Sequence, residues 1–231
     1  MQLTFTFERE PILLQIRNRL VQIYGQQRDE LRHEPTPQWV KAMISSRTLD
    51  AISDGAFVRL RGLPSWDMLA QMKTTEITPM IHDVTFAQNK AIHLAKSAQI
   101  IKRRRGTVEL DFLADWPTQV AFDWLNSLPG TGPKVACVTL NFSTLRRPVF
   151  AIDTHVLRVF WRLGLAPNRH NFKRGYITLS NLIPNNWDAD DLYELHWLMK
   201  YLGQKICTHE RPLCGRCPLA SLCPSAACLQ A

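Results

Sequence analysis

The chain has 231 residues, of which 45% are hydrophobic, and its 28 lysine and arginine residues outnumber 20 acidic ones, giving a formal charge of +8 and an isoelectric point near 9.4. This length and composition indicate a globular chain with one large or two small cores. The charge favours a polyanionic partner, nucleic acid before an anionic membrane surface. The net charge alone is weak evidence for such a partner, because many small basic proteins bind no polyanion.

Targeting signals are missing from the sequence pattern. The first ten residues, MQLTFTFERE, contain two acidic residues and no apolar stretch of signal-peptide length. No window approaches the 18 or more apolar residues of a membrane helix. We therefore expect a cytoplasmic, nucleoid-associated protein with no membrane partner. In that reducing setting, six cysteines favour a metal site or core packing over disulfides.

Helical periodicity dominates the chain. The first helix is predicted by apolar residues that recur at spacings of three and four, namely Ile12, Leu13, Ile16, Leu20 and Ile23. Gly25 stands where its C-cap belongs, and a polar link at residues 28–30 leads to Pro35 and Pro37, which open a second helix. Further helices are predicted at residues 57–63, 66–72, 91–101, 119–128, 134–142, 155–163 and 190–206. No alternating strand pattern is longer than LTFTF at residues 3–7, so the fold class is all-α.

Four cysteines are concentrated near the end of the chain. Cys207, Cys214, Cys217 and Cys223 follow the pattern C-x6-C-x2-C-x5-C, threaded with prolines and polar residues. Four thiolates this close together can converge on one metal centre. Tetrahedral zinc and an iron-sulfur cluster suit the spacing about equally. Cys137, in an apolar helix, is interpreted as a packing residue.

The segment LPGTGPK, residues 128–134, predicts a hairpin before a helix. Gly130 and Gly132, on either side of Thr131, allow positive φ and close approach to a partner, and Pro133 suits a first helical turn. Exposed amides beside a helix N-terminus form a phosphate site. With helices on both sides, the segment indicates a helix-hairpin-helix that grips the nucleic-acid backbone without reading sequence, with Gly130, Thr131 and Gly132 as the expected DNA-binding residues. A glycine pair before a helix is also a common plain connection.

Lys134 is the residue that a tight turn does not explain. Contact with a phosphate is the commonest role for a lysine at this position. A lysine at a helix start also feels the positive end of the helix dipole, and partial desolvation then favours its neutral, nucleophilic form. Such an amine can displace a base from an anomeric carbon and hold the opened sugar as a Schiff base. This chemistry needs a carboxylate nearby, and Asp153 in the segment AIDTH can supply it as well as cap a helix.

Together these motifs resemble the endonuclease III family of helix-hairpin-helix DNA glycosylases. The resemblance rests on LPGTGPK, IDTHVLRV and the four spaced cysteines, includes AMISSRTLD (residues 42–50), and runs from about residue 10 to residue 224. It implies a six-helix barrel domain at residues 28–146 that carries the hairpin. It also implies a second helical domain, residues 1–27 and 147–231, with a 4Fe-4S cluster, and an active site in the cleft between the domains.

The resemblance also assigns roles to residues. Lys134 matches the family's Schiff-base lysine, Asp153 its catalytic aspartate, and Cys207, Cys214, Cys217 and Cys223 its cluster ligands, which favours iron over zinc. The implied activity is bifunctional: a damaged base is excised, and β-elimination then cuts the strand 3′ to the abasic sugar. The partner is double-stranded DNA with damaged bases or abasic sites, bound by a monomer.

Departures from the family pattern lie in the residues that fill the gap left by an extruded base. Arg47 occupies the position usually held by a glutamine; it can fill the gap and prefers guanine edges, or it contacts only phosphate. Phe86, in the loop at residues 82–91, roughly matches the family's apolar wedge. A core position for Phe86 is an equal alternative.

Other basic and aromatic residues give weaker indications. The run KRRRG, residues 102–106, is either a DNA-facing strip or a solvated helix end. Arg211 and Arg216, inside the cysteine loop, are the better candidates for phosphate contacts. His155 is expected to orient the helix start after Asp153, and His196 and Trp197 are expected in a core or interface.

Three functional hypotheses follow. The first is the bifunctional glycosylase and lyase acting on oxidised or ring-saturated pyrimidines. The second is a monofunctional adenine- or thymine-directed mismatch glycosylase, which Lys134 argues against because such relatives generally lack that lysine. The third is a non-catalytic iron-sulfur DNA-binding protein, which the joint presence of Lys134 and Asp153 disfavours.

Overall fold

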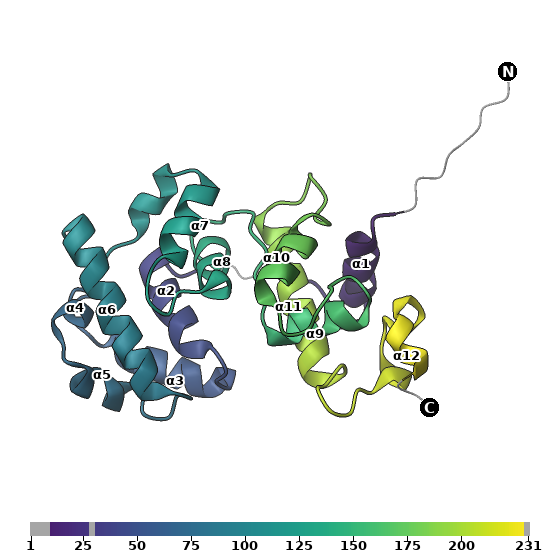
Figure 1. Cartoon of the computed structure of the whole chain (residues 1–231), viewed down its shortest axis with the longest axis horizontal. Coiled ribbons are helices and arrows are strands. Elements are labelled where there is room, and N and C mark those ends of the chain that lie inside the picture. Colours follow the sequence, from purple (N-terminus) through teal and green to yellow (C-terminus); the bar gives the residue numbers. More distant parts are fainter. Residues whose placement is uncertain (1–9, 28–30, 229–231) are drawn as a thin grey trace, which may run out of the picture. The chain divides into compact units, whose positions relative to one another are not determined.

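The computed structural model describes residues 10–27 and 31–228 (Figure 1). The LTFTF segment and the polar link at residues 28–30 lie outside these ranges. The described residues form helices and connecting turns with no strand, so the all-α prediction is confirmed. Within the described part of the chain, no helix has the length and apolar character needed to span a bilayer.

The chain divides into two compact units, one formed by Asp29–Ala151 and the other by Met1–Arg28 with Ile152–Ala231. The structure therefore places the second boundary after Ala151, whereas the sequence analysis placed it after residue 146. We call the first the hairpin unit and the second the cysteine unit.

The hairpin unit is built around one buried helix. Its elements are α2 (Pro35–Ser45), α3 (Asp50–Arg61), α4 (Met68–Gln71), α5 (Thr74–Met80), α6 (Ala87–Arg105), the 3-10 turn η1 (Asp111–Asp115), α7 (Thr118–Asn126) and α8 (Pro133–Phe142). Helix α2 packs against α3, α6 and α8, and α6 lies alongside α4 and α5 (Figure 1). Because α2 is covered on several sides, its residues from Trp39 to Ile44 are almost all buried.

The cysteine unit is assembled on its longest helix. It contains α1 (Ile12–Tyr24), α9 (Thr154–Arg162), α10 (Phe172–Ser180), α11 (Ala189–Lys205), the short turns η2 (Cys214–Arg216) and η3 (Ala220–Leu222), and α12 (Pro224–Cys228). Helices α1 and α9 pack on α11. A capping box between Asp188 and Asp191 fixes the start of α11, and Gly25 caps α1 with φ +75° as predicted.

Two kinds of element departed from the sequence prediction. The periodicity analysis missed α5, η1, α10, η2, η3 and α12, which are short, contain proline or glycine, or are weakly apolar. Helix α6 is longer than predicted, because the run at residues 102–105 forms its last turn before Gly106. There Lys102 pairs with Asp67 at 3.1 Å and the Arg105 guanidinium lies 3.9 Å from the centre of the Phe112 ring. The basic run is therefore a helix end.

Candidate functional site

The two glycines of the hairpin between α7 and α8 have different backbone conformations. Gly130 has φ +75°, and a Cβ there would lie 2.7 Å from the Cβ of His93 on α6. Gly132 is extended, with φ −77°, and a Cβ there would meet nothing within 4 Å. The prediction of positive φ is therefore confirmed for Gly130 and wrong for Gly132. At Gly132 the missing side chain leaves open space beside the helix start.

The hairpin presents amide donors at the surface. Gly130 and Gly132 are both exposed, and neither amide has an acceptor among the described residues. Ser97 of α6 holds the turn from below by donating to the Pro129 carbonyl at 2.7 Å. Two amides on exposed residues beside the N-terminus of α8, neither with an acceptor in the described part of the chain, suit an anionic oxygen.

Thr131 has a packing role instead of the expected DNA contact. Its side chain is 1% exposed, and its hydroxyl oxygen accepts a hydrogen bond of 2.9 Å from Trp39 Nε1. Its amide donates to the Leu128 carbonyl at 3.0 Å. Both polar groups therefore point into the unit, and Thr131 anchors the hairpin onto α2.

Lys134 lies in the first turn of α8 and is partly buried. Its Nζ donates to Ser45 Oγ at 3.3 Å, at the last residue of α2. The ammonium end is thus held beside the C-terminus of α2, against the body of the hairpin unit. A lysine held in this way loses little rotamer entropy when it reacts, in contrast to one that extends into solvent.

A second lysine, Lys90, lies close to Lys134 and was missed by the sequence analysis. It is in the first turn of α6, is 8% exposed, and donates from Nζ to the carbonyls of Ile44 and Ser46. Burial, with a smaller contribution from the positive charge of Lys134, lowers the pKa of Lys90 to about 8. A lysine at this position of a mixed polar helix gives no sequence signal that it is buried.

The two residues expected to fill a base gap are exposed on separate loops. Arg47 follows α2 and has φ +56°, and Phe86 precedes α6 and has φ +59°. Phe86 is 57% exposed, so the alternative that it belongs to the core is wrong. The loop assigned to residues 82–91 ends at Phe86, because α6 begins at Ala87. Both side chains are in position to meet a partner.

Asp153 is the N-cap of α9 in the cysteine unit. Its Oδ1 accepts from the Val156 amide at 2.8 Å, and its side chain is partly exposed. The capping role expected from the sequence is therefore present. His155 is half-buried beside Gly203, and burial is the main cause that lowers its pKa. Its Nδ1 lies 3.1 Å from Arg158 Nη2, so the ring helps to order the start of α9.

Four cysteine side chains line one pocket of the cysteine unit. Cys207, Cys214, Cys217 and Cys223 line a small cavity of about 20 Å³ together with Ile206, Leu213 and Ala220. None is in a disulfide. In the described ranges, no group of three or more His, Cys, Asp or Glu side chains is arranged so that it could hold a metal ion.

The chemistry of these thiols fits a group that brings positive charge. Burial is the main cause that raises the pKa of Cys217 and of Cys223, and repulsion from the other cysteines adds to it. The thiolate forms of Cys217 and Cys223 are therefore disfavoured, and a bound cation would stabilise them. An iron-sulfur cluster or zinc supplies that charge.

Two buried arginines of α9 hold the start of the cysteine loop. Arg162 donates to Cys207 Sγ at 3.2 Å and to the Thr208 and His209 carbonyls. Arg158 donates to the carbonyls of Cys207 and Gly203. Two arginines four residues apart in a largely apolar helix were a signal for buried, bonded arginines, and the sequence analysis did not use it.

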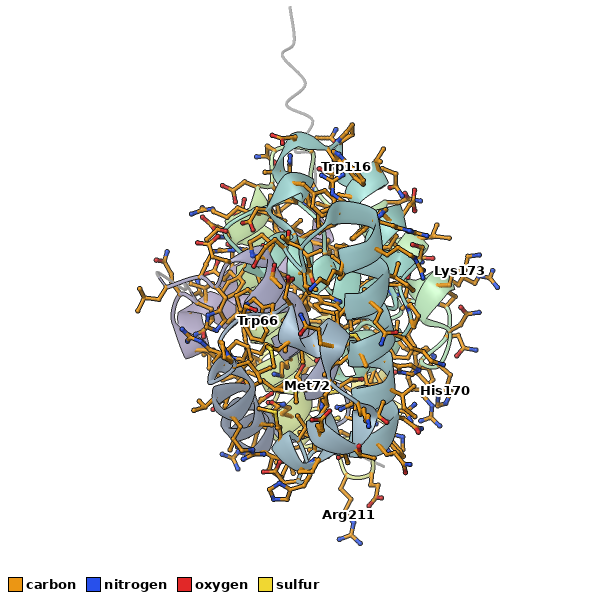
Figure 2. All side chains as sticks on the ribbon, turned by 90° about the vertical axis from the view of Figure 1, so that its left-hand side faces the viewer. Trp66, Met72, Trp116, His170, Lys173 and Arg211 are labelled. Atoms are coloured by element: carbon orange, nitrogen blue, oxygen red, sulfur yellow. The ribbon has the colours of Figure 1, made fainter. Side chains whose placement is uncertain are left out.

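The remaining candidates are placed as follows. Arg211 and Arg216 are both exposed on the cysteine loop, and Figure 2 shows Arg211 extending away from the ribbon. Cys137 is fully buried, as expected of a packing residue. His196 is 3% exposed and lies against the ring of Trp197, in agreement with the expected core position.

An all-α chain with a hairpin between α7 and α8 and a pocket of four cysteines belongs to a class known from DNA repair. A family described as HhH-GPD superfamily base excision DNA repair protein matches residues 22–184. The chain belongs to this family. The resemblance to endonuclease III proteins inferred from the motifs is confirmed by similar curated proteins.

The relatives are similar over most of this chain. The endonuclease III-like protein 1 of Gallus gallus is 30% identical over 187 residues, which is 80% of this chain and 62% of that protein. The chloroplastic endonuclease III homolog 1 of Arabidopsis thaliana is 31% identical, over 80% of this chain and 48% of that protein. The chain thus spans less than two thirds of these relatives.

The fold matches solved structures closely. A structure described as a trapped endonuclease III-DNA covalent intermediate with an estranged adenine has a TM-score of 0.78 and 24% identity, covering 95% of this chain and 97% of that one. A thermostable thymine-DNA glycosylase has a TM-score of 0.70 at 17% identity. These likenesses confirm the two-domain helix-hairpin-helix glycosylase fold.

Proposed function

We propose that this protein is a bifunctional DNA glycosylase and abasic-site lyase of base excision repair, acting on oxidised or ring-saturated pyrimidines in duplex DNA as a monomer. The observation that carries the proposal is the placement of Lys134. Its amine is partly buried, tethered to Ser45, and located one residue into the helix that follows a phosphate-binding hairpin. A lysine needed only for phosphate contact has no reason to be withdrawn from solvent.

In the proposed reaction, the neutral amine of Lys134 attacks C1′ of the damaged nucleotide. The N-glycosidic bond breaks, and the base leaves with a proton. The sugar ring opens to a Schiff base on Nζ, loss of a C2′ proton then breaks the C3′–O bond, and water releases the product. The attack on C1′ needs a nitrogen that is both nucleophilic and fixed in position.

Asp153 is the proposed carboxylate partner of Lys134. Oxocarbenium character at C1′ is stabilised by a negative charge, and the amine must lose protons during attack. The bond from the Val156 amide to Oδ1 fixes the orientation of the carboxylate at the start of α9. The relative whose structure is described as a trapped covalent intermediate with DNA supports a reaction of this type.

Duplex DNA is the proposed partner, gripped through its backbone. The exposed amides of Gly130 and Gly132 provide donors on the hairpin, and Arg211 and Arg216 provide charge on the cysteine loop. A base that reacts at C1′ must leave the stack, and Arg47 and Phe86 are the exposed side chains proposed to fill the gap. The Arg47 guanidinium would favour guanine as the opposite base.

We further propose that Cys207, Cys214, Cys217 and Cys223 hold a 4Fe-4S cluster. When bound, the cluster supplies the positive charge that four neighbouring thiolates need. The residues of the chain do the rest: Arg162 donates to the Cys207 sulfur, and the ordered loop presents Arg211 and Arg216 outward. Purified protein should be yellow-brown and absorb visible blue light, as expected of thiolate-ligated iron. Colourless protein with one zinc per chain would contradict this.

Borohydride trapping on DNA with an abasic site tests the main proposal. The native chain should form a covalent adduct, because reduction freezes the Schiff base. Lys134→Gln should abolish the adduct, while Lys96→Gln, at an exposed lysine of α6, should retain it. Asp153→Asn should keep duplex binding and slow adduct formation by at least about 100-fold.

Other outcomes separate the alternatives. An adduct of equal yield in Lys134→Gln would remove this lysine from its role. Base release without any adduct in the native chain would indicate a monofunctional mismatch glycosylase. Duplex binding with neither base release nor adduct would indicate a non-catalytic DNA-binding protein.

A further inference from the structure

Two loops of the hairpin unit carry exposed side chains on strained backbone. The first loop, residues 46–49, carries Arg47, and the second loop, residues 81–86, carries Phe86. Both residues have left-handed φ values, +56° and +59°. A residue with a Cβ keeps this conformation only where surrounding contacts hold it. The contacts that hold these two loops therefore matter for both tips.

The buried ammonium of Lys90 is the main contact of the first loop. Its Nζ donates to the Ile44 carbonyl at 2.6 Å and to the Ser46 carbonyl at 2.5 Å. A third bond, of 3.1 Å, reaches Thr48 Oγ1. Lys90 thus uses all three donors on one short segment. It caps the end of α2, whose last carbonyls lack helical partners, and continues into the loop.

The same group connects the first loop to the second. Thr48 Oγ1, which accepts from Lys90, also accepts from the Thr85 amide at 3.2 Å. Thr85 directly precedes Phe86, and the Lys90 amide donates to the Phe86 carbonyl at 3.0 Å. Lys90 therefore binds Ser46 and Thr48, the two neighbours of Arg47. Through Thr48 and through its own amide, it is also connected to Thr85 and Phe86 in the second loop.

We propose that Lys90 and Thr48 are positioning residues that hold the tips of the two loops, Arg47 and Phe86, in one fixed arrangement for joint insertion into a duplex. This inference rests on the proposed function. Neither residue needs to touch the reacting sugar. Preorganised tips avoid the entropy cost of ordering two loops at the moment when a nucleotide is extruded.

The proximity of Lys90 to Lys134 suggests a competing role. Two ammonium groups near each other repel, so Lys90 could act through its charge on the amine of Lys134 and not through the loops. The positions of the hydrogen bonds favour the loops, because all three are made to residues 44–48. An experiment must separate insertion from chemistry.

Insertion can be measured without any chemistry. The probe is a duplex with a stable tetrahydrofuran analogue of an abasic site opposite 2-aminopurine, whose fluorescence rises when it is unstacked. Overall binding is followed separately by the anisotropy of a labelled duplex. Adduct formation on a natural abasic site, measured against pH, reports the chemistry of Lys134.

Three variants test the proposal. Lys90→Met removes the ammonium but keeps the length of the side chain, and Thr48→Val removes the bridging oxygen while leaving the bonds to Ile44 and Ser46. Lys41→Met is the matched control, since this lysine of α2 pairs with Asp54 at 3.1 Å and lies over the Phe57 ring, and both of these partners belong to α3. Thr48→Val keeps the test possible if Lys90→Met does not fold.

The proposal expects a specific division of effects. When equal fractions of the duplex are bound, Lys90→Met and Thr48→Val should reduce the rise in 2-aminopurine fluorescence by roughly tenfold. The anisotropy, which reports overall binding, should change little. Lys41→Met should behave like the native chain. An undiminished response in both loop variants would overturn it. The proposal would also be overturned if Lys90→Met gave a full fluorescence response but a shifted pH profile of adduct formation. That result would mean that Lys90 acts through the effect of its charge on the amine of Lys134.

Failure of the proposed function would look different. A native chain that unstacks the probe but forms no adduct on abasic DNA would refute the lyase and support the positioning role, provided that the loop variants lose the response.

Discussion

Gly130 and Gly132 are separated by one residue, but glycine is needed at the two positions for different reasons. At Gly130 the backbone has left-handed φ and His93 leaves no room for a Cβ, whereas Gly132 has ordinary φ and open space. The first glycine therefore serves the fold of the hairpin. The second leaves access to its surface.

Paired substitutions should separate these demands. Gly130→Ala should lower the free energy of unfolding by roughly 1–3 kcal/mol, because it adds both backbone strain and a clash with His93. Gly132→Ala should change it by less than about 1 kcal/mol, yet weaken duplex binding, since a methyl group would stand beside the exposed amide. Urea unfolding and anisotropy measure the two effects. Equal loss of stability in both variants would contradict this division.

The buried ammonium of Lys90 makes stability depend on pH. Its pKa is about 8 in the folded chain against an ordinary value of 10.5, so the folded state disfavours its charge. This penalty is fully present below about pH 8 and disappears as the pH rises towards 10.5, where the unfolded lysine also becomes neutral.

The free energy of unfolding of the native chain, relative to that of Lys90→Met, should therefore increase between about pH 8 and pH 10.5. Titrations of other groups cancel in this difference. Urea unfolding of both proteins at pH 7.5, 9 and 10 measures it. A difference that falls with pH would mean that the three oxygen acceptors outweigh desolvation.

At the scale of elements, helix α9 links two parts of the proposed chemistry. Its N-cap is Asp153, and its last turn carries Arg162, which bonds to the first cysteine and the two carbonyls after it. A rigid helix between the two fixes the carboxylate and the cysteine loop in one frame. The loop itself has only short turns, η2 and η3, and depends on such contacts.

Arg162→Met should loosen the cysteine loop. It leaves the Thr208 and His209 carbonyls without their donor and removes the bond to the Cys207 sulfur, and loss of such supporting contacts typically costs roughly 10–100-fold in metal affinity. Iron content and the rate of bleaching by a chelator measure this. Arg169→Met is the control, because this partly exposed arginine lies over the Trp161 ring and bonds to His170 instead of a cysteine. Unchanged bleaching in Arg162→Met would assign Arg162 to packing alone.

At the scale of the whole molecule, charge sets how the chain meets DNA. The net charge is +8, and exposed arginines such as Arg211 project from the surface (Figure 2). Binding through phosphates releases counterions, so affinity should fall steeply as salt rises.

The double variant Arg211→Gln/Arg216→Gln should reduce the slope of log affinity against log salt by about 2, because each lost phosphate contact contributes roughly 0.9. Titration of a labelled duplex between about 50 and 200 mM salt measures the slope. An unchanged slope would show that neither arginine meets a phosphate.

Local sequence patterns determined much of this protein. The long helices were predicted from the spacing of apolar residues, and the hairpin before α8 from the glycines and Pro133. The shared pocket was predicted from four spaced cysteines. Each of these signals lies within one short stretch of chain. The same locality explains the missed short helices, whose few apolar residues do not establish a period.

Tertiary structure alone decided which polar side chains turn inward. Trp39 and Thr131 bond across 92 positions, Lys90 and Thr48 across 42, and Arg162 and Cys207 across 45. No local pattern marks these residues as different from their exposed neighbours, since burial of a polar group is set by what distant segments bring to it. The sequence therefore specified the helices and the candidate chemistry, and the packing of those helices decided which residues hold that chemistry in place.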